Sequence, residues 1–369
     1  MRWTLLIGLL AGGCGKHAPT PGELGKQVFF DQALSQPEGQ ACADCHAPHV
    51  AFRDPESDHT TSSGILDNHF GPRNAPSIMY ARWVPDLHQD RSGAWFGGMF
   101  WDGRAASFEA QAGFPLLNPS EMNNPDKAAV VAAVRKASYA GAFDQIYGDG
   151  ALDDVDKAFD HISNAIAEYE RTEELAPFSS KYDRYLAKQV ALTPAELRGL
   201  AVFSDPKKGN CAGCHPPPMF TDYRYANLGI PKYGNSRFYE QGGKINPEGE
   251  AYIDHGLMTT VKDPAQDGKF RTPTLRNIGR TAPYGHNGYF ENLMYMLDFL
   301  NTRDTGSKDP NVKPWAAPEV PANVDQRIGN LGLTDGEVDD LEAFLQTLTD
   351  ELEKAPPPIR NPRTVKAKP

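Results

Sequence analysis

Residues 202–222, VFSDPKKGNCAGCHPPPMFTD, nearly repeat an earlier stretch, VFFDQALSQPEGQACADCHAPHVAFRD at residues 28–54. Both stretches run from Val-Phe through a nearby Asp to C-x-x-C-H, and both continue with Pro and then Phe-x-Asp. The repetition extends to RNAPSI at residues 73–78 and RTPTL at residues 271–275. It predicts two related units, each built around one C-x-x-C-H.

C-x-x-C-H is the attachment motif for c-type haem, because its two thiols bond the porphyrin vinyl groups and the adjacent imidazole ligates the iron. A zinc ribbon would hold its two Cys pairs about 15–20 residues apart, whereas these pairs stand at 42–45 and 211–214. A redox dithiol has no need of the following His. We therefore predict two covalently bound haem c groups, one on Cys42, Cys45 and His46 and one on Cys211, Cys214 and His215.

The composition is that of an ordinary globular protein: of 369 residues, 40% are hydrophobic and 23% are charged. The net charge of −11 argues against a nucleic-acid partner, since phosphate binding needs clustered Lys and Arg. The same charge is compatible with a positively charged protein partner.

The N-terminal sequence MRWTLLIGLLAGGCG predicts a secretory signal at residues 1–13, because a membrane span needs about 20 apolar residues. Its Ala-Gly-Gly-Cys junction resembles a bacterial lipobox, which would make Cys14 the lipidated first residue of the mature chain. A tether at residues 14–21 would then hold a periplasmic protein to the membrane. Signal cleavage without lipidation is the alternative.

Helical patterns dominate the rest of the chain. We expect helices at residues 23–34 and 126–136, a longer one with an apolar face from Val155 to Tyr169, and two capped by Thr193 and Thr334. Residues 47–124 are expected to be irregular and the tail 355–369 disordered. The predicted fold class is therefore mainly α, with two related cytochrome c-like haem domains, residues 22–175 and 176–354, and long irregular loops.

Six motifs occur along the chain in this order: CADCH, RNAPS, FWDGRA, NPSEM, CAGCH and RTPTLRNIGRTAPYGHNG. With these motifs in this order, the chain resembles the bacterial di-haem cytochrome c peroxidase family, including its MauG-like branch. The resemblance implies a peroxide site at the N-terminal haem and electron transfer through the C-terminal haem. It also implies that Glu121 is the acid/base carboxylate, that Gln111 lines the same pocket and that Trp101 stands between the haems. The alternative for Glu121 is an ordinary loop glutamate without a catalytic role, and the alternative for Trp101 is a side chain that only packs in the core.

The same resemblance gives Asn74, Thr281 and Pro283 as ligands of a calcium ion between the domains, where oxygen donors suit the metal. A loop role without a metal is the alternative for Asn74. His286 is expected near the second haem without binding its iron.

The distal side of the second haem departs from the family pattern. The family places Met or Tyr where this chain has Leu300, which cannot bind iron. Met296 is one helical turn earlier and could reach the iron if the helix shifts, whereas Met294 and Tyr295 should point elsewhere. The alternative is that Met296 packs in the hydrophobic core and does not bind iron.

Over the first haem, His59 and His69 are interpreted as surface histidines, which leaves the peroxide site open. The leading functional hypothesis is reduction of hydrogen peroxide, with electrons from a small cytochrome c or cupredoxin. One alternative is a MauG-like enzyme that uses peroxide to oxidise residues of a protein substrate. The other is a non-catalytic di-haem electron carrier. The sequence leaves a homodimer open.

Overall fold

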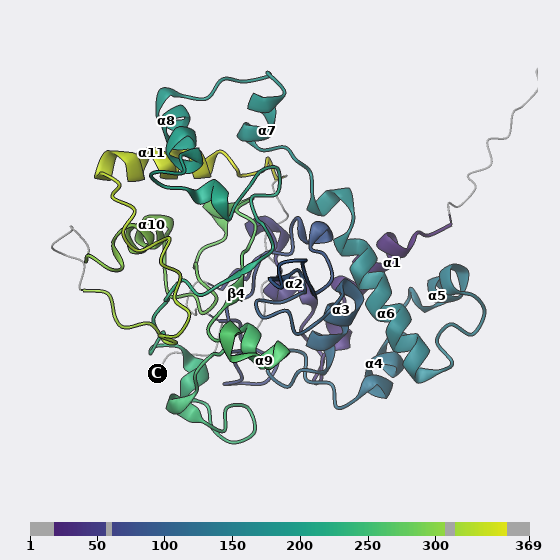
Figure 1. The fold of residues 1–369 in the computed structure, drawn as a ribbon. Helices are drawn as coiled ribbons and strands as arrows, with labels where there is room; N and C mark the ends of the chain where they lie inside the picture. Colours follow the sequence, from purple (N-terminus) through teal and green to yellow (C-terminus); the bar gives the residue numbers. More distant parts are fainter. Residues whose placement is uncertain (1–17, 57–60, 307–313, 353–369) are drawn as a thin grey trace, which may run out of the picture.

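The computed structural model describes residues 18–56, 61–306 and 314–352. Short helices joined by long irregular segments dominate it, so the prediction of a mainly α chain is confirmed (Figure 1). The α-helices are α1 (Pro21–Phe29), α2 (Cys42–Cys45), α3 (Phe108–Leu117), α4 (Lys127–Val134), α5 (Ala140–Tyr147), α6 (Val155–Glu170), α7 (Lys181–Leu186), α8 (Pro194–Ser204), α9 (Leu257–Val261), α10 (Leu293–Thr302) and α11 (Asp335–Gln346). Two antiparallel ribbons pair β1 (His88–Gln89) with β2 (Trp95–Phe96) and β3 (Tyr225–Ala226) with β4 (Phe270–Arg271).

One group of helices is organised around α6, on the right of Figure 1. Helices α1, α3 and α4 all pack against it. The crossing with α1 is close because Gly25 has no side chain, and a Cβ there would overlap the backbone carbonyl of Ala165. The hydrophobic cluster of this group includes Leu24, Val28, Phe29, Val131, Phe143, Ile162 and Ile166.

A second group repeats this arrangement with α8 packed against α11, in the upper left of Figure 1. Here Gly199 is the point of close approach, since a Cβ at this position would overlap the carbonyl of Asp340. Helix α10 also packs on α11. Each C-x-x-C-H thus follows a helix that crosses a later helix at a glycine. The cluster of this second group includes Phe203, Phe220, Leu297, Phe299, Leu341, Phe344 and Leu345.

The predicted helix starts are confirmed by their caps. Thr193 and Thr334 each accept a hydrogen bond from the backbone of a Glu three residues later, and each Glu bonds back to its cap. The helix expected at residues 126–136 runs over Lys127–Val134, with Asp126 as its cap. The helix expected at 23–34 ends at Phe29, and a separate 3₁₀ turn covers Gln32–Leu34.

One expectation is wrong: residues 47–124 are not irregular throughout, because α3 lies within them. Ser107 caps α3, and Phe108, Ala112 and Leu116 are buried along it. Pro115 lies in its last turn, where the helix is about to end, and this proline concealed the helix in the sequence.

Some sequence predictions lie outside the described residues: the signal, Cys14, His59 and the tail from residue 355. Across residues 18–56, 61–306 and 314–352, no helix has the length and apolar character needed to cross a bilayer.

Candidate functional site

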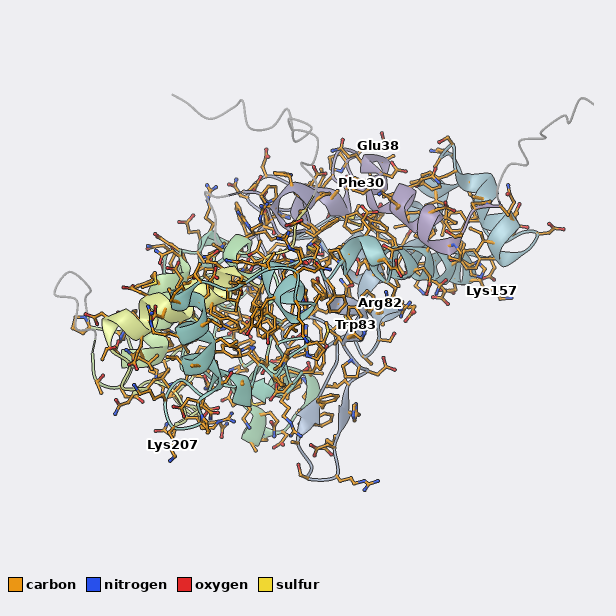
Figure 2. The ribbon with its side chains drawn as sticks, turned by 90° about the horizontal axis from the view of Figure 1, so that it is seen from above. Phe30, Glu38, Arg82, Trp83, Lys157 and Lys207 are labelled. Atoms are coloured by element: carbon orange, nitrogen blue, oxygen red, sulfur yellow. The ribbon has the colours of Figure 1, made fainter. Side chains whose placement is uncertain are left out.

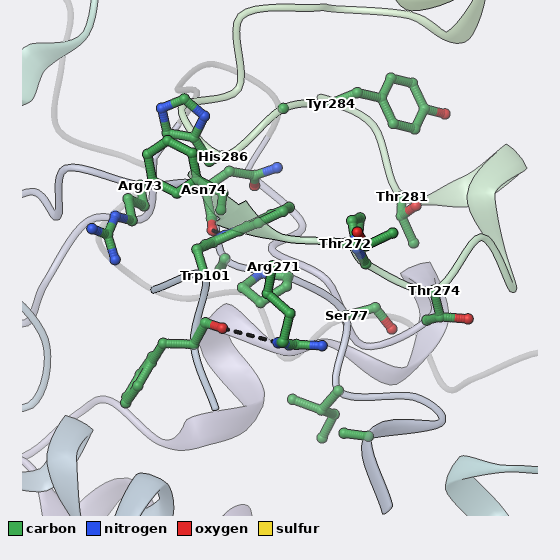
Figure 3. A pocket seen from close by; sticks show the side chains of 18 of the residues that line it. Arg73, Asn74, Ser77, Trp101, Arg271, Thr272, Thr274, Thr281, Tyr284 and His286 are labelled. Atoms are coloured by element: carbon green, nitrogen blue, oxygen red, sulfur yellow. Dashed lines mark hydrogen bonds between the residues drawn. The ribbon is translucent and has the colours of Figure 1, made fainter. Parts of the chain in front are cut away.

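Both C-x-x-C-H motifs open onto one cavity of about 700 Å³. Its wall is made by segments from the two helix groups, including residues 71–81 and 270–276. These are the two segments that the sequence repeats as RNAPSI and RTPTL, and Figure 3 shows part of this wall.

The first motif holds its histidine by a backbone contact. Helix α2 carries Cys42 and Cys45, and His46 follows at its end. The Nδ1–H of His46 donates to the carbonyl of Phe52 (3.1 Å), because a carbonyl can only accept. Ser77 in turn donates its hydroxyl proton to the carbonyl of Ala51 (2.6 Å).

The second motif repeats these contacts. The Nδ1–H of His215 donates to the carbonyl of Phe220 (2.9 Å), and the hydroxyl of Thr274 donates to the carbonyl of Met219 (2.6 Å). The repeated Phe-x-Asp and the repeated Pro-Ser/Thr thus perform the same two tasks in both halves. With Nδ1 committed, each imidazole keeps Nε2 as its only free ligand atom, which is the arrangement that metal-binding histidines use.

The donor set of each motif suits covalent haem. All four cysteines, Cys42, Cys45, Cys211 and Cys214, are free thiols. Burial raises the pKa of Cys42 and of Cys211 to about 12, and it lowers the pKa of His46 and His215, so the imidazoles are held neutral. Within the described part of the chain, no three His, Cys, Asp or Glu side chains gather as a metal ion would require.

Arg271 is a further sign of an anionic occupant. Its Nε donates to the carbonyl of Phe100 (3.3 Å; dashed in Figure 3). No carboxylate of the described residues pairs with its guanidinium, and burial lowers its pKa. A guanidinium that is largely removed from water and has no carboxylate partner is costly. Haem carries two propionates that would supply the missing charge, so the cavity fits the predicted cofactor.

Glu121 and Gln111 both line this cavity. Helix α3 carries Gln111, and the turn after it brings Glu121 back to the same wall. Asn118 Nδ2 donates to Glu121 Oε1 (3.0 Å). Burial raises the pKa of Glu121, and the positive charge of Arg104 partly opposes that shift. A half-buried carboxyl with a raised pKa is suited to proton transfer.

Trp101 joins the two halves of the cavity. Its indole Nε1–H donates to the carbonyl of Asn74 (2.9 Å), and its own carbonyl accepts from the backbone N–H of Arg271 (2.8 Å). Figure 3 shows the three residues together on the wall.

The residues expected at a calcium site also converge. Asn74 Nδ2 donates to the carbonyl of Pro283 (2.7 Å), and Thr281 lines the same cavity (Figure 3). The backbone N–H of Asn74 donates to the carbonyl of His286 (2.8 Å), so His286 lies beside this group. A half-turn of the Asn74 amide would present its oxygen in place of its nitrogen.

Helix α10 turns Met296 and Leu300 toward the cavity that His215 lines. Met294 and Tyr295 do not line it; Tyr295 instead stacks on Tyr289. Of these side chains, those of Met296 and Leu300 are therefore the ones available to an occupant of the cavity. The Nδ1–H of His69 donates to the carbonyl of Pro119 (2.9 Å), and His69 does not line the cavity.

Sequence reasoning missed two buried charged features. Arg73 forms ion pairs with Asp254 (2.6 Å) and Asp102 (2.7 Å), which ties RNAPSI to the second half; no local pattern reveals such distant partners. Glu170 lines the cavity, and burial raises its pKa to about 8. The sequence does contain a sign of Glu170, because this residue is four residues after Ile166 and interrupts the apolar face of α6.

Comparisons with known proteins agree with this site. A family model described as di-haem cytochrome c peroxidase matches residues 20–191. The methylamine utilization protein MauG of Paracoccus denitrificans is 40% identical over 348 residues, covering 89% of this chain and 88% of that protein. Cytochrome c551 peroxidase of Nitrosomonas europaea is 32% identical over 267 residues, covering 72% of this chain and 68% of that protein.

Among solved structures, the diheme peroxidase BthA of Burkholderia thailandensis superposes with a TM-score of 0.78 at 34% identity, over 91% of this chain and 87% of that one. A family with two haem c groups matches the two motifs and the shared cavity. The chain therefore belongs to the di-haem cytochrome c peroxidase family, in which both cytochrome c peroxidases and MauG proteins are found.

Proposed function

We propose that this protein is a di-haem cytochrome c peroxidase that reduces hydrogen peroxide to water. Two electrons and two protons would convert one peroxide into two waters. Peroxide would react in the N-terminal haem domain, residues 22–175, and a small cytochrome c or cupredoxin would deliver electrons through the C-terminal haem domain, residues 176–354. The observation that carries the proposal is the half-buried Glu121, whose pKa is raised, on the wall of the cavity that His46 also lines.

The bound haem would supply an iron that accepts peroxide oxygen and passes electrons. Cys42, Cys45 and His46 would hold the first haem, and Cys211, Cys214 and His215 the second. Met296, which faces this cavity from α10, is our candidate for the distal ligand of the second iron.

Glu121 would move one proton. Cleavage of the O–O bond requires a proton to pass from the inner to the outer peroxide oxygen, and a carboxyl with a raised pKa can accept and return it. Asn118 orients the carboxyl through its 3.0 Å hydrogen bond. Gln111 would hold peroxide in the same pocket, and Trp101 would pass electrons between the two halves.

A calcium ion held by Asn74, Thr281 and Pro283 is part of the proposal. The donors would be one amide oxygen and two backbone carbonyls, and water would complete the coordination. The ion would hold together the segments of Asn74 and Pro283, which a hydrogen bond from the Asn74 amide to the Pro283 carbonyl joins in this structure. We also propose export to the periplasm and a lipid on Cys14, which replacement of Cys14 by Ser would abolish in a palmitate-labelling experiment.

The test is the replacement Glu121→Gln, which keeps the shape of the side chain and removes its acid/base chemistry. We expect kcat/KM for peroxide to fall by about 10²–10⁴ with reduced small cytochrome c as donor. Glu38→Gln is the matched control, since Glu38 is exposed at the surface (Figure 2) and should leave the rate unchanged. An unchanged rate in Glu121→Gln would refute the role proposed for Glu121, and an absence of peroxide turnover and of any Soret change in the wild type would favour a non-catalytic electron carrier.

A second candidate function is MauG-like oxidation of a protein substrate by peroxide. The 40% identity to a MauG protein favours it. The two functions separate in one experiment. Steady oxidation of the reduced cytochrome by peroxide supports the peroxidase. A change of the Soret band on addition of peroxide, without turnover of the cytochrome, supports oxidation of a protein partner.

A further inference from the structure

Two stacked aromatic rings connect the cavity to the protein surface. Tyr80 lines the cavity and is 2% exposed, whereas Trp83 is 37% exposed. Their ring centroids are 6.0 Å apart at an interplanar angle of 24°. Phe178 packs edge-on against both, at 5.0 Å from Tyr80 and 5.2 Å from Trp83. Figure 2 shows Trp83 beside Arg82. The stack therefore leads from the cavity to water without a break.

The phenol of Tyr80 has a built-in proton acceptor. Its O–H donates to both carboxylate oxygens of Asp350, at 2.9 and 2.8 Å, and its oxygen accepts from the backbone N–H of Phe178 (2.9 Å). Asp350 is 2% exposed and also accepts from Asn277 Nδ2 (2.8 Å) and from the backbone N–H of Ser179 (2.9 Å). A phenol that loses an electron must also release its proton, and this carboxylate is in place to receive it.

The indole of Trp83 forms the solvent-exposed end of the stack. The guanidinium of Arg82 lies 4.9 Å from its ring centroid and disfavours a positive charge on the ring. An oxidised Trp83 would therefore be neutral, having lost its N–H proton to water. Structural packing alone explains a buried Tyr that is bonded to an Asp. It does not require that the Tyr stack on an exposed indole.

We propose that Tyr80 and Trp83 form a one-electron relay between the cavity and the surface. The proposal rests on the proposed function, because peroxide reacting at the first haem is the oxidant. Tyr80 gives one electron to that centre and its phenol proton to Asp350. It is restored by one electron from Trp83, and the proton returns from Asp350. Trp83, having released its N–H proton to water, is restored by one electron from a reductant in solution and one proton from water.

The relay can be tested by mapping oxidation in the haem-loaded protein. Equimolar hydrogen peroxide is added without any donor, and peptides are then examined by mass spectrometry for oxygen added to Trp83. Trp95, which is outside the cavity wall, is the internal reference. We expect oxidation of Trp83 in the wild type, and severalfold less in Tyr80→Phe and in Asp350→Asn. Tyr182→Phe is the matched control, because Tyr182 is buried away from the cavity and should not alter the result.

Freeze-quench electron paramagnetic resonance gives a second readout. Trp83→Phe should trap the organic radical on Tyr80, and Tyr80→Phe should remove it. Equal oxidation of Trp83 in the wild type and in Tyr80→Phe, with the same peroxide-induced Soret change, would overturn the relay alone. An intact Trp83 in a wild-type protein whose Soret band does respond would do the same. No Soret response to peroxide would remove the proposed function and the relay together.

Discussion

Replacing Gly199 by Ala should destabilise the second helix group. A Cβ at this position would lie 2.6 Å from the carbonyl carbon of Asp340 and 2.8 Å from the Cβ of Phe344, where ordinary contacts begin at 3.4 Å. Helices α8 and α11 would have to separate by roughly 1 Å. Overpacking of this kind costs about 3 kcal/mol, and the better helix propensity of Ala returns about 1 kcal/mol. The net loss of unfolding free energy is about 2 kcal/mol.

Gly141→Ala is the matched control, because Gly141 is also helical, in α5, and a Cβ there meets nothing within 4 Å. It should be neutral or stabilising by up to about 1 kcal/mol. Thermal unfolding of the haem-loaded protein, followed by calorimetry and Soret circular dichroism, measures both variants. A loss of about 2 kcal/mol corresponds to a midpoint lower by roughly 4–8 °C for a unit of this size. A Gly199→Ala protein that unfolds at or above the wild-type temperature would refute the close crossing.

Three further predictions concern the cavity. If Met296 ligates the second iron, Met296→Leu should remove the thioether-to-iron charge-transfer band and change the reduction potential of one haem, whereas Met294→Leu, off the cavity wall, should leave both unchanged. The folded-state pKa of Glu170, raised to about 8, means that its burial weakens the fold progressively as pH rises from about 4.5 to about 8. The free energy of unfolding of Glu170→Gln should therefore exceed that of the wild type by up to about 4 kcal/mol at pH 8 and be about equal to it at pH 4. Urea midpoints of the variant and the wild type that are equal at both pH values would contradict this. A calcium chelator should lower the thermal midpoint of the wild type but not that of Asn74→Ala, and a wild-type midpoint insensitive to the chelator would count against the calcium site.

Much of the site could be predicted because its parts are encoded locally and twice. The repeated Phe-x-Asp places a carbonyl against each histidine, and the repeated Pro-Ser/Thr supports the neighbouring carbonyl. The helix caps at Thr193 and Thr334 are equally local, since each needs only a Glu three residues away.

Contacts between distant segments could not be predicted. Arg73 meets Asp254, and Tyr80 meets Asp350, across separations of 181 and 270 residues. Such pairs depend on how the two helix groups come together, which no spacing in the sequence describes. Helix α3 was missed for a different reason: Pro115 suggests a break, because proline has no N–H to donate within a helix, yet α3 continues through it for two more residues.

The matching histidine supports have a consequence for how two irons in one chain could differ. Both imidazoles receive the same polarisation from a phenylalanine carbonyl, and in both halves a hydroxyl binds the carbonyl of the residue just before that phenylalanine. Each imidazole would therefore donate electron density to its iron to a nearly equal extent. Any difference in role between the irons would then have to come from other residues of the cavity; under our proposal these are Glu121 for the first iron and Met296 for the second. Evolution or an engineer could then reassign the two roles by exchanging a few side chains on those faces, while leaving the duplicated scaffold intact.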